Sequence, residues 1–271
     1  NQYFLDEQSM VTGLFRDTSW AGNASIAVTG LGLASLCVAI SKDYLGREEA
    51  ERRVELLLDN LLKNPYKQYG MFFHFLEMDT GKPVPGCLIS SIDNAFLAAG
   101  LITVSQYFKG EIEKKANQIL NGMQWNRFLN KDEQAKHYHL FSVGIDDKMN
   151  ISPVYWGQYS DEILLIQLIA LGSPNAKIPV DVYERWLRPK GQSLSGHTFI
   201  YSYFNSLFTY QYGSMFFNFK NKKDYLGTDW WKNSQIAIQH QIDWADKIGK
   251  YSYAKDFFGV TSFYTPDEYV M

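Results

Sequence analysis

Two neighbouring carboxylates, Asp161 and Glu162, stand where a long apolar run begins in the segment QYSDEILLIQLIALGSP. Glycosidic bonds are commonly cleaved by two carboxyl groups, one of which donates a proton to the leaving oxygen while the other activates water or attacks the sugar. Acidic residues are also common in the first turn of a helix, where the positive end of the helix dipole stabilises negative charge. The segment therefore supports two interpretations, a catalytic acid and the start of a helix.

The residues around Glu162 argue in both directions. Ser160 is a suitable N-cap, and a helix N-terminus lowers the pKa of a carboxyl, which opposes a role as general acid. Burial beside Tyr155, Trp156 and Tyr159 would raise the pKa of Glu162, which favours that role. Successive helical residues point about 100° apart, so Asp161 and Glu162 are not expected to share one task. Asp161 is therefore assigned to substrate binding, and Glu162 is the first candidate for the acid.

Four other charged residues are candidates for the same chemistry. Asp93 precedes an apolar helical segment and is predicted to act as a general base or to bind a sugar hydroxyl, with helix capping as the alternative. Arg16 and Asp17 either hold each other in a salt bridge or bind a sugar hydroxyl. Glu77, in HFLEMDTG, is a possible second carboxylate, although the following Asp-Thr-Gly is equally suited to a turn.

Aromatic residues make up 16% of the 271 residues, with 18 Tyr, 18 Phe and 7 Trp. Pyranose rings have apolar faces and polar rims, so aromatic side chains suit them. Trp20, Trp156 and Tyr159 are predicted to stack on sugar rings. Packing in a large core is the alternative for each of them.

The elements that would position these side chains form an alternating helical pattern. Segments that are apolar nearly all round alternate with segments that have a polar face, and the first kind is expected inside and the second outside. The expected helices are Ala24–Ile40, Arg47–Leu62, Ile92–Phe108, Glu111–Met123, Glu162–Leu171 and Val180–Leu187, with a weaker pair at about Ser206–Phe217 and Asn233–Ile248.

This alternation predicts an all-α fold, a ring of helical hairpins around an inner helical barrel, with an irregular helical bundle as the alternative. Short strands are expected between the hairpins at Met71–Glu77 and His137–Val143. The loops before the inner helices, DTSWAGNAS, GCLISSID, YWGQYSDE and FTYQYGS, would meet at one end of such a ring and form one cavity. No linker divides the chain, so residues 1–271 are interpreted as a single domain.

Composition and motifs exclude several other functions. The net charge of −3, with basic and acidic residues interspersed, opposes nucleic-acid binding. No segment reaches the roughly 18 uncharged apolar residues of a membrane span. The two cysteines form no metal motif or disulfide framework, and Cys37 is expected to be a buried thiol. His137 and His139 alone do not define a zinc site. Neither a metal nor a cofactor is therefore expected.

Six sequence blocks in one order resemble the bacterial glucoamylase-like family of glycoside hydrolases, which includes endo-β-1,2-glucanases and a domain of cyclic β-1,2-glucan synthases. The blocks are TGLFRDTSW, ASIAVTGLGLA, FFHFLEMDTG, SSIDNAFLAAGLI, YSDEILLIQLIALGSP and FTYQY, and the match extends to Asn233-Ser234 and FFGVTS. The resemblance implies an (α/α)6 toroid with a carbohydrate cleft at one end. It also implies a catalytic role for Glu162, with Asp93 matching the Asp of the family's S-T-I-D block.

The chain departs from the family pattern at several positions. FTYQYGS replaces an FTHQYSH-like block, so Tyr210 and Ser214 occupy histidine positions, and Tyr210 and Gln211 are assigned to substrate binding. Asn218 stands where an Asp is common, and Leu88 stands where a Glu precedes the S-T-I-D block. About eight or nine of twelve toroid helices can be placed, so the toroid is expected to be incomplete and the chain truncated or short.

The predicted function is hydrolysis of a glucan, with β-1,2-glucan favoured, by carboxylate acid–base chemistry. The alternatives are a carbohydrate-binding homologue that has lost turnover and a fragment of a larger enzyme. The expected partner is an oligo- or polysaccharide, and the protein is expected to be a monomer. A first residue Asn is compatible with a removed signal peptide, which predicts a periplasmic or secreted protein.

Overall fold

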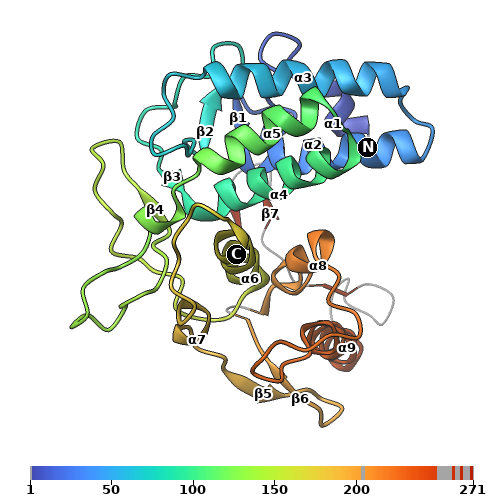
Figure 1. Ribbon diagram of the computed structural model, residues 1–271. Helices are drawn as coiled ribbons and strands as arrows, with labels where there is room; N and C mark the ends of the chain where they lie inside the picture. Colours follow the sequence, from blue (N-terminus) through green and yellow to red (C-terminus); the bar gives the residue numbers. More distant parts are fainter. Residues whose placement is uncertain (1, 203–204, 249–257, 260–262, 265–268, 271) are drawn as a thin grey trace. The chain divides into compact units, whose positions relative to one another are not determined.

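The structure is a computed structural model that describes residues 2–202, 205–248, 258–259, 263–264 and 269–270 (Figure 1). The family block FFGVTS therefore lies outside the described residues except for Phe258 and Gly259. The helices are α1 (Gln2–Asp6), α2 (Ile26–Ser41), α3 (Arg47–Lys63), α4 (Ser91–Tyr107), α5 (Glu111–Gly122), η1 (Trp125–Arg127), α6 (Asp161–Gly172), α7 (Val182–Arg185), η3 (Leu207–Tyr210), α8 (Tyr212–Phe216) and α9 (Trp230–Ile248).

The strands are short and pair two by two in antiparallel, two-stranded sheets. The four pairs are β1 (Asn23–Ser25) with β2 (Phe75–Glu77), β3 (Ile89–Ser90) with β4 (Gly144–Ile145), β5 (Lys190–Gln192) with β6 (Thr198–Ile200), and β7 (Phe263–Tyr264) with β8 (Tyr269–Val270). The predominance of helix with a few two-stranded sheets agrees with the all-α class predicted from the sequence.

The chain forms two compact units. Unit 1 consists of Asn1–Tyr155 and Ile166–Glu184, and unit 2 consists of Trp156–Leu165 and Arg185–Met271. The division passes through α6, whose first turn belongs to unit 2. The interpretation of residues 1–271 as a single domain stays a prediction.

Unit 1 has the two kinds of helix that the sequence predicts. In α4 almost every position from Ser91 to Leu101 is buried, and α2 has no charged residue. In α3 and α5 only one face is buried, with Val54, Leu57 and Leu61 in α3 and Ile112 and Ile119 in α5. Helix α4 packs on α2 and on α5, and α5 packs on α3 (Figure 1). The apolar helices α2 and α4 thus form the inside of unit 1.

Two glycines allow α2 and α4 to approach each other closely. A Cβ atom added to Gly100 would lie 2.2 Å from the carbonyl oxygen of Gly30, and one added to Gly30 would lie 2.1 Å from the carbonyl oxygen of Phe96. Both neighbours are backbone atoms, which cannot move aside as a flexible side chain can. The helices touch here backbone to backbone, and this contact fixes their spacing.

Replacing Gly100 by valine is therefore expected to destabilise the protein by about 3 kcal/mol or more, because the added side chain must push the two helices apart. The urea midpoint of unfolding measures this loss. The matched control is Gly122→Ala in α5, where an added Cβ meets nothing within 4 Å, and there stability should change by less than about 1 kcal/mol. Equal effects of the two changes would contradict the close contact.

The predicted strand His137–Val143 is wrong over its first part. His137–His139 lie in consecutive turns, with the N–H of Tyr138 bonded to the carbonyl of Ala135 at 3.0 Å and His139 at φ +60°. The two histidines therefore do not share a strand face. His137 stacks on Tyr155, and Nδ1 of His139 lies 2.9 Å from a carboxylate oxygen of Asp181. Both histidines thus have local partners within unit 1.

Two other elements are shorter than predicted. Helix α7 ends at Arg185 because Leu187 bonds in both directions to an extended segment, donating to the carbonyl of Gly157 and accepting from the N–H of Tyr159, each at 2.9 Å. The predicted helix at about 206–217 is divided into η3 and α8, with Gln211 between them at φ −120°. Backbone bonds to another segment and a local break override helical propensity here.

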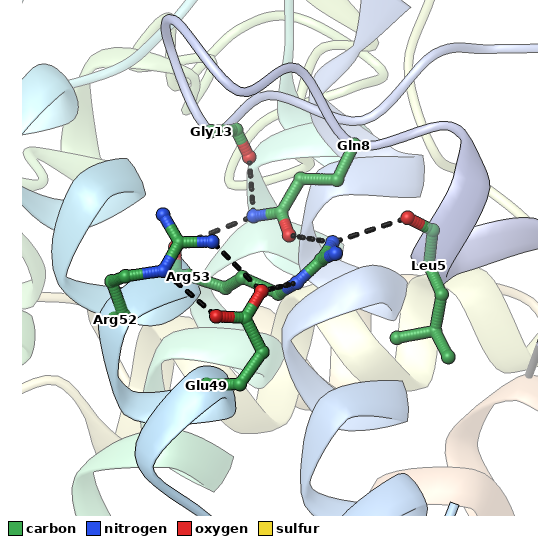
Figure 2. Close-up of polar contacts among 6 residues, drawn as sticks. All are labelled: Leu5, Gln8, Gly13, Glu49, Arg52 and Arg53. Atoms are coloured by element: carbon green, nitrogen blue, oxygen red, sulfur yellow. Dashed lines mark hydrogen bonds and ion pairs between the residues drawn. The ribbon is translucent and has the colours of Figure 1, made fainter. Parts of the chain in front are cut away.

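A polar cluster ties the N-terminal segment to α3. Figure 2 shows Arg53 bonded to Glu49 at 2.7 Å, to the carbonyl of Leu5 at 3.1 Å and to Oε1 of Gln8 at 3.2 Å. Gln8 in turn donates to the carbonyl of Gly13. Hydrogen bonds from Arg52 and Arg53 lower the pKa of Glu49 to about 2.

Arg53→Met should destabilise the protein by about 1–2 kcal/mol, because it leaves the Gln8 amide and the Leu5 carbonyl without this donor. Arg52→Met is the matched control: Arg52 is bonded to the same carboxylate but is more exposed, and its loss should cost about 0.5 kcal/mol or less. Since the pKa of Glu49 is depressed in the folded state, its contribution is present above the ordinary glutamate pKa and is lost as pH falls toward 2. Urea unfolding at pH 7 and pH 3 measures the loss of stability in each variant and its dependence on pH. Equal losses of stability in the Arg52 and Arg53 variants would contradict the structural role of Arg53.

Candidate active site

The first turns of α2 and α4 are each capped by a serine at the end of the strand that precedes the helix. Ser25 at the end of β1 caps α2 by accepting from the N–H of Val28, and Ser90 at the end of β3 caps α4 by accepting from the N–H of Asp93. Between them lies His74, whose carbonyl accepts from Ile26 at 3.0 Å and whose N–H donates to Leu88 at 2.8 Å. His74 is therefore bonded through its backbone to the first residue of α2 and to the residue just before β3, the strand that leads into α4.

Two titratable side chains approach each other at this place, and a third interacts with both electrostatically. Nδ1 of His74 lies 3.4 Å from Oδ2 of Asp93, which is an ion-pair distance when the ring is protonated. The side chain of Asp93 is 12% exposed, whereas the side chain of His74 is 34% exposed. Asp17, half-buried in the loop before β1, interacts electrostatically with both. The three side chains are named the Asp17–His74–Asp93 cluster, and all belong to unit 1.

The electrostatics of the cluster are seen most directly at Asp17. Burial raises its pKa above the usual range of an aspartate, the charge of His74 lowers the pKa, and the carboxylate of Asp93 raises it. Carboxylate and imidazole groups that interact in this way can accept and donate protons. Such a cluster is suited to acid–base chemistry.

Arg16 does not pair with the neighbouring Asp17, so that alternative in the sequence interpretation is wrong. Its Nε lies 2.8 Å from Glu7, and its Nη1 donates to the carbonyl of Ala21 at 2.6 Å. Tyr3 adds a bond from its hydroxyl to the carbonyl of Arg16. Arg16 thereby folds the loop that carries Asp17 and Trp20, and Asp17 is left to interact with His74 and Asp93.

Trp20 and Glu77 have different surroundings. Trp20 is 77% exposed on the loop that begins with Asp17, so its ring is available to stack on a ligand. Glu77 is exposed and accepts a hydrogen bond from the Thr80 hydroxyl, while its carbonyl accepts from the N–H of Gly81. Glu77 thus closes the turn that follows β2, as the turn interpretation of HFLEMDTG proposes.

At the start of α6, Ser160 caps the helix and Glu162 is half-buried in its first turn. Ser160 is the cap, because its Oγ accepts from the N–H of Ile163 at 3.2 Å and its carbonyl accepts from Leu164. Glu162 is half-buried in the first turn, and Trp156 is also half-buried. Capping therefore does not need the carboxylate of Glu162. The side chain of Asp161 lies outside what the structure describes.

Tyr159 and Tyr210 are core residues, which corrects their assignment to sugar stacking and substrate binding. Both rings are fully buried, and Tyr159 stacks on Trp230 with the ring centres 4.7 Å apart. The hydroxyl of Tyr210 donates to Asn205 and accepts from the N–H of Ser202. With Trp186 these rings form the aromatic core of unit 2. Gln211, which follows Tyr210 in the chain, is exposed.

His74 is the member of the cluster that the sequence interpretation missed. It stands in the block FFHFLEMDTG, in which the sequence interpretation assigned a possible catalytic role to Glu77 and not to the histidine. The available signal was a histidine next to the first residue of a strand that precedes an inner helix. Its pairing with Asp93 depends on contact between segments 19 residues apart in the chain, which the local pattern does not reveal.

Unit 2 contains a separate cavity of ≈ 340 Å³ at the start of α9. It is lined by Lys190 and Phe199 from the β5–β6 hairpin and by Asp229, Lys232 and Asn233 around the first turn of α9. None of the residues predicted to act in catalysis or substrate binding lines this cavity.

Among the described residues, no group of three His, Cys, Asp or Glu side chains is arranged to hold a metal ion. Both cysteines are free thiols, and Cys37 is buried as predicted. None of the helices within the described ranges combines the length and hydropathy needed to cross a bilayer.

Comparison with known proteins confirms the resemblance and the fold class. Residues 153–271 match the Glycoamylase family model, described as "Putative glucoamylase". An exo-β-1,2-glucooligosaccharide sophorohydrolase (non-reducing end) of Parabacteroides distasonis is 25% identical over 199 residues, which is 67% of this chain and 26% of that protein. This chain thus spans about a quarter of the length of that curated relative.

Two solved structures have the same fold as this chain. An endo-β-1,2-glucanase from Chitinophaga pinensis, solved with sophorotriose and glucose, matches with a TM-score of 0.83 and 23% identity, over 99% of this chain and 70% of that one. A structure titled "putative glucoamylase" from Bacteroides uniformis matches with a TM-score of 0.88 and 20% identity, over 99% and 69%. The predicted all-α fold of the glucoamylase-like toroid type is confirmed by this likeness.

Proposed function

We propose that this chain, a relative of the glucoamylase-like glycoside hydrolases, hydrolyses a β-linked glucan, with β-1,2-glucan favoured, by carboxylate acid–base catalysis without a metal. The observation that carries the proposal is the Asp17–His74–Asp93 cluster at the starts of two inner helices. The linkage rests on the relatives, one named as a β-1,2-glucooligosaccharide hydrolase and one as an endo-β-1,2-glucanase.

In the proposed reaction Glu162 protonates the glycosidic oxygen while the bond from the anomeric carbon to that oxygen breaks. Asp93 acts as the second carboxylate and takes a proton from water, whose oxygen bonds to the anomeric carbon. One water is consumed, and one new reducing end and one new non-reducing end are formed. Asp17 and the exposed ring of Trp20 bind the sugar beside Asp93, the first through a hydroxyl and the second by stacking. Arg16, Trp156, Asp161 and Gln211 complete the proposed substrate contacts.

Substrate class, oligomeric state, domain organisation and location are part of the same proposal. The substrate is an oligo- or polysaccharide, the protein acts as a monomer with residues 1–271 as a single domain, and it is located in the periplasm or outside the cell. A polymeric glucan found outside the cytoplasm is the substrate that such a location provides.

A carbohydrate-binding protein without turnover is the second candidate. Leu88, in the place of the family's glutamate, uses its carbonyl to accept from His74 and offers no carboxyl group. Tyr210, in the place of a histidine, is buried in the core of unit 2. These two substitutions remove polar groups that the family pattern places before and within its cleft-forming segments.

One assay set distinguishes the two candidates. The protein is incubated with linear β-1,2-glucan and, in parallel, with β-1,3-, β-1,4- and α-1,4-glucans, and new reducing ends are measured together with binding by calorimetry. Reducing ends formed from β-1,2-glucan support hydrolysis. Saturable binding without new reducing ends supports the binding protein, and neither turnover nor binding on any glucan overturns both candidates.

A further inference from the structure

We propose that His74 is a positioning residue of the active site, which holds the carboxylate of Asp93 in place and offsets the negative charge of Asp17 and Asp93. The proposal rests on the function proposed above and assigns a role in it to a side chain that is not one of the acid–base pair. Three observations support it: the backbone hydrogen bonds of His74, the approach of its ring to Asp93, and the electrostatic effect of both His74 and Asp93 on Asp17.

The backbone of His74 is fixed more firmly than that of an ordinary strand end. Its carbonyl accepts from Ile26, the first residue of α2, and its N–H donates to Leu88, just before β3. The next residue, Phe75, pairs with Ser25 in the β1–β2 sheet, and its ring lies 3.8 Å from the His74 ring in a stacked arrangement. Backbone bonds to the start of α2 and to the residue before β3, together with stacking on Phe75, restrict where the imidazole can lie.

The ring of His74 approaches the carboxylate of Asp93. Nδ1 and Oδ2 are 3.4 Å apart, and Asp93 is the more deeply buried of the pair. A buried carboxylate that must accept a proton from water benefits from a neighbour that fixes its orientation. Asn94, the next residue of α4, is bonded through its side chain to the backbone N–H and carbonyl of Phe72. Two consecutive residues of the first turn of α4 thus contact the segment that leads into β2.

Charge is the second reason for a histidine here. Asp17 comes from the loop before β1 and Asp93 from α4, and the carboxylate of Asp93 raises the pKa of Asp17. The charge of His74, whose ring approaches Asp93 to 3.4 Å, acts on the pKa of Asp17 in the opposite sense. In a partly buried site a second carboxylate disfavours the ionised form of an aspartate, and a nearby cation favours it. His74 therefore favours the ionised form of Asp17.

The experiment follows the Asp17 carboxyl by NMR in protein labelled with ¹³Cγ-aspartate, with the signal assigned by its loss in Asp17→Asn. His74→Asn and His74→Phe should both raise the pKa of Asp17 relative to the unsubstituted protein, because each removes the nearby positive charge. Asp93→Asn should lower it, because it removes the like charge. His197→Asn, an exposed histidine of unit 2, is the matched control and should leave it unchanged. No change in either His74 variant would overturn the proposal.

Activity supplies the readout of positioning. His74→Phe should lower kcat by about 10²-fold with little change in KM, because loss of orientation costs rate more than binding. His74→Asn keeps a side-chain N–H near the position of Nδ1 and should recover part of that loss. Equal kcat in His74→Phe and the unsubstituted protein overturns the role of His74 even where glucan hydrolysis is observed. If no glucan is hydrolysed, the proposed function fails, while the titration of Asp17 still decides whether His74 offsets the cluster charge.

Discussion

Asp93→Asn is expected to lower kcat on β-1,2-glucan by about 10²–10⁴-fold, which is the usual contribution of one acid or base to an enzymatic rate. Asparagine has the size of aspartate but accepts no proton from water at neutral pH. The carboxylate that loses its function is the buried one at 3.4 Å from His74. The proton-accepting step, and therefore kcat rather than KM, should carry the effect.

The fold should tolerate this change, so that the effect can be attributed to chemistry. The cap of α4 is Ser90, which accepts from the backbone N–H of residue 93 and not from its side chain. Asp43→Asn is the control: Asp43 is exposed at φ +57°, a conformation that asparagine also adopts readily. Urea unfolding of both variants checks the fold. Activity of Asp93→Asn within threefold of that of the unsubstituted protein would remove Asp93 from the mechanism.

Glu162→Gln is expected to reduce kcat by about 10²–10⁴-fold as well, because a neutral amide has no proton to give to the leaving oxygen at working pH. The substitution also tests whether Glu162 only supports the helix. Ser160 already caps α6, so the loss of the helix-dipole interaction of a first-turn carboxylate is expected to cost about 0.3–1 kcal/mol of stability. A large loss of rate with a small loss of stability is the result that favours catalysis.

The matched control for Glu162 is Glu48→Gln in α3. Glu48 is also an exposed glutamate in the first turn of its helix. Its replacement by glutamine removes the same kind of interaction with a helix dipole. Rates are compared on activated glycosides as well as on glucan, since a good leaving group needs less protonation and should restore part of the rate of Glu162→Gln. An equal loss of kcat on both substrates would show that Glu162 is not the acid.

The helices of this protein follow from its sequence, because they depend on local pattern. The all-apolar segments became α2, α4 and α6, and the amphipathic segments became α3, α5 and α9, with ends within a few residues of those expected. Periodicity is a local property, and burial of an apolar face is decided by the same residues that display it. The positions of Asp93 and Glu162 in first turns were predictable for the same reason.

Partners and depth of burial were decided by tertiary structure. The sequence places Arg16 next to Asp17, yet Arg16 pairs with Glu7, and Asp17 interacts with His74 and Asp93 instead. Tyr159 lies beside Glu162 in the chain, but its ring is stacked inside unit 2 against Trp230, 71 residues away. Ion pairs and ring stacking act through space over a few ångströms, and a sequence pattern does not encode which distant segments come that close. The acid–base candidates Asp93 and Glu162 could therefore be predicted from the sequence. The role of His74 beside Asp93 could be recognised only from the tertiary structure.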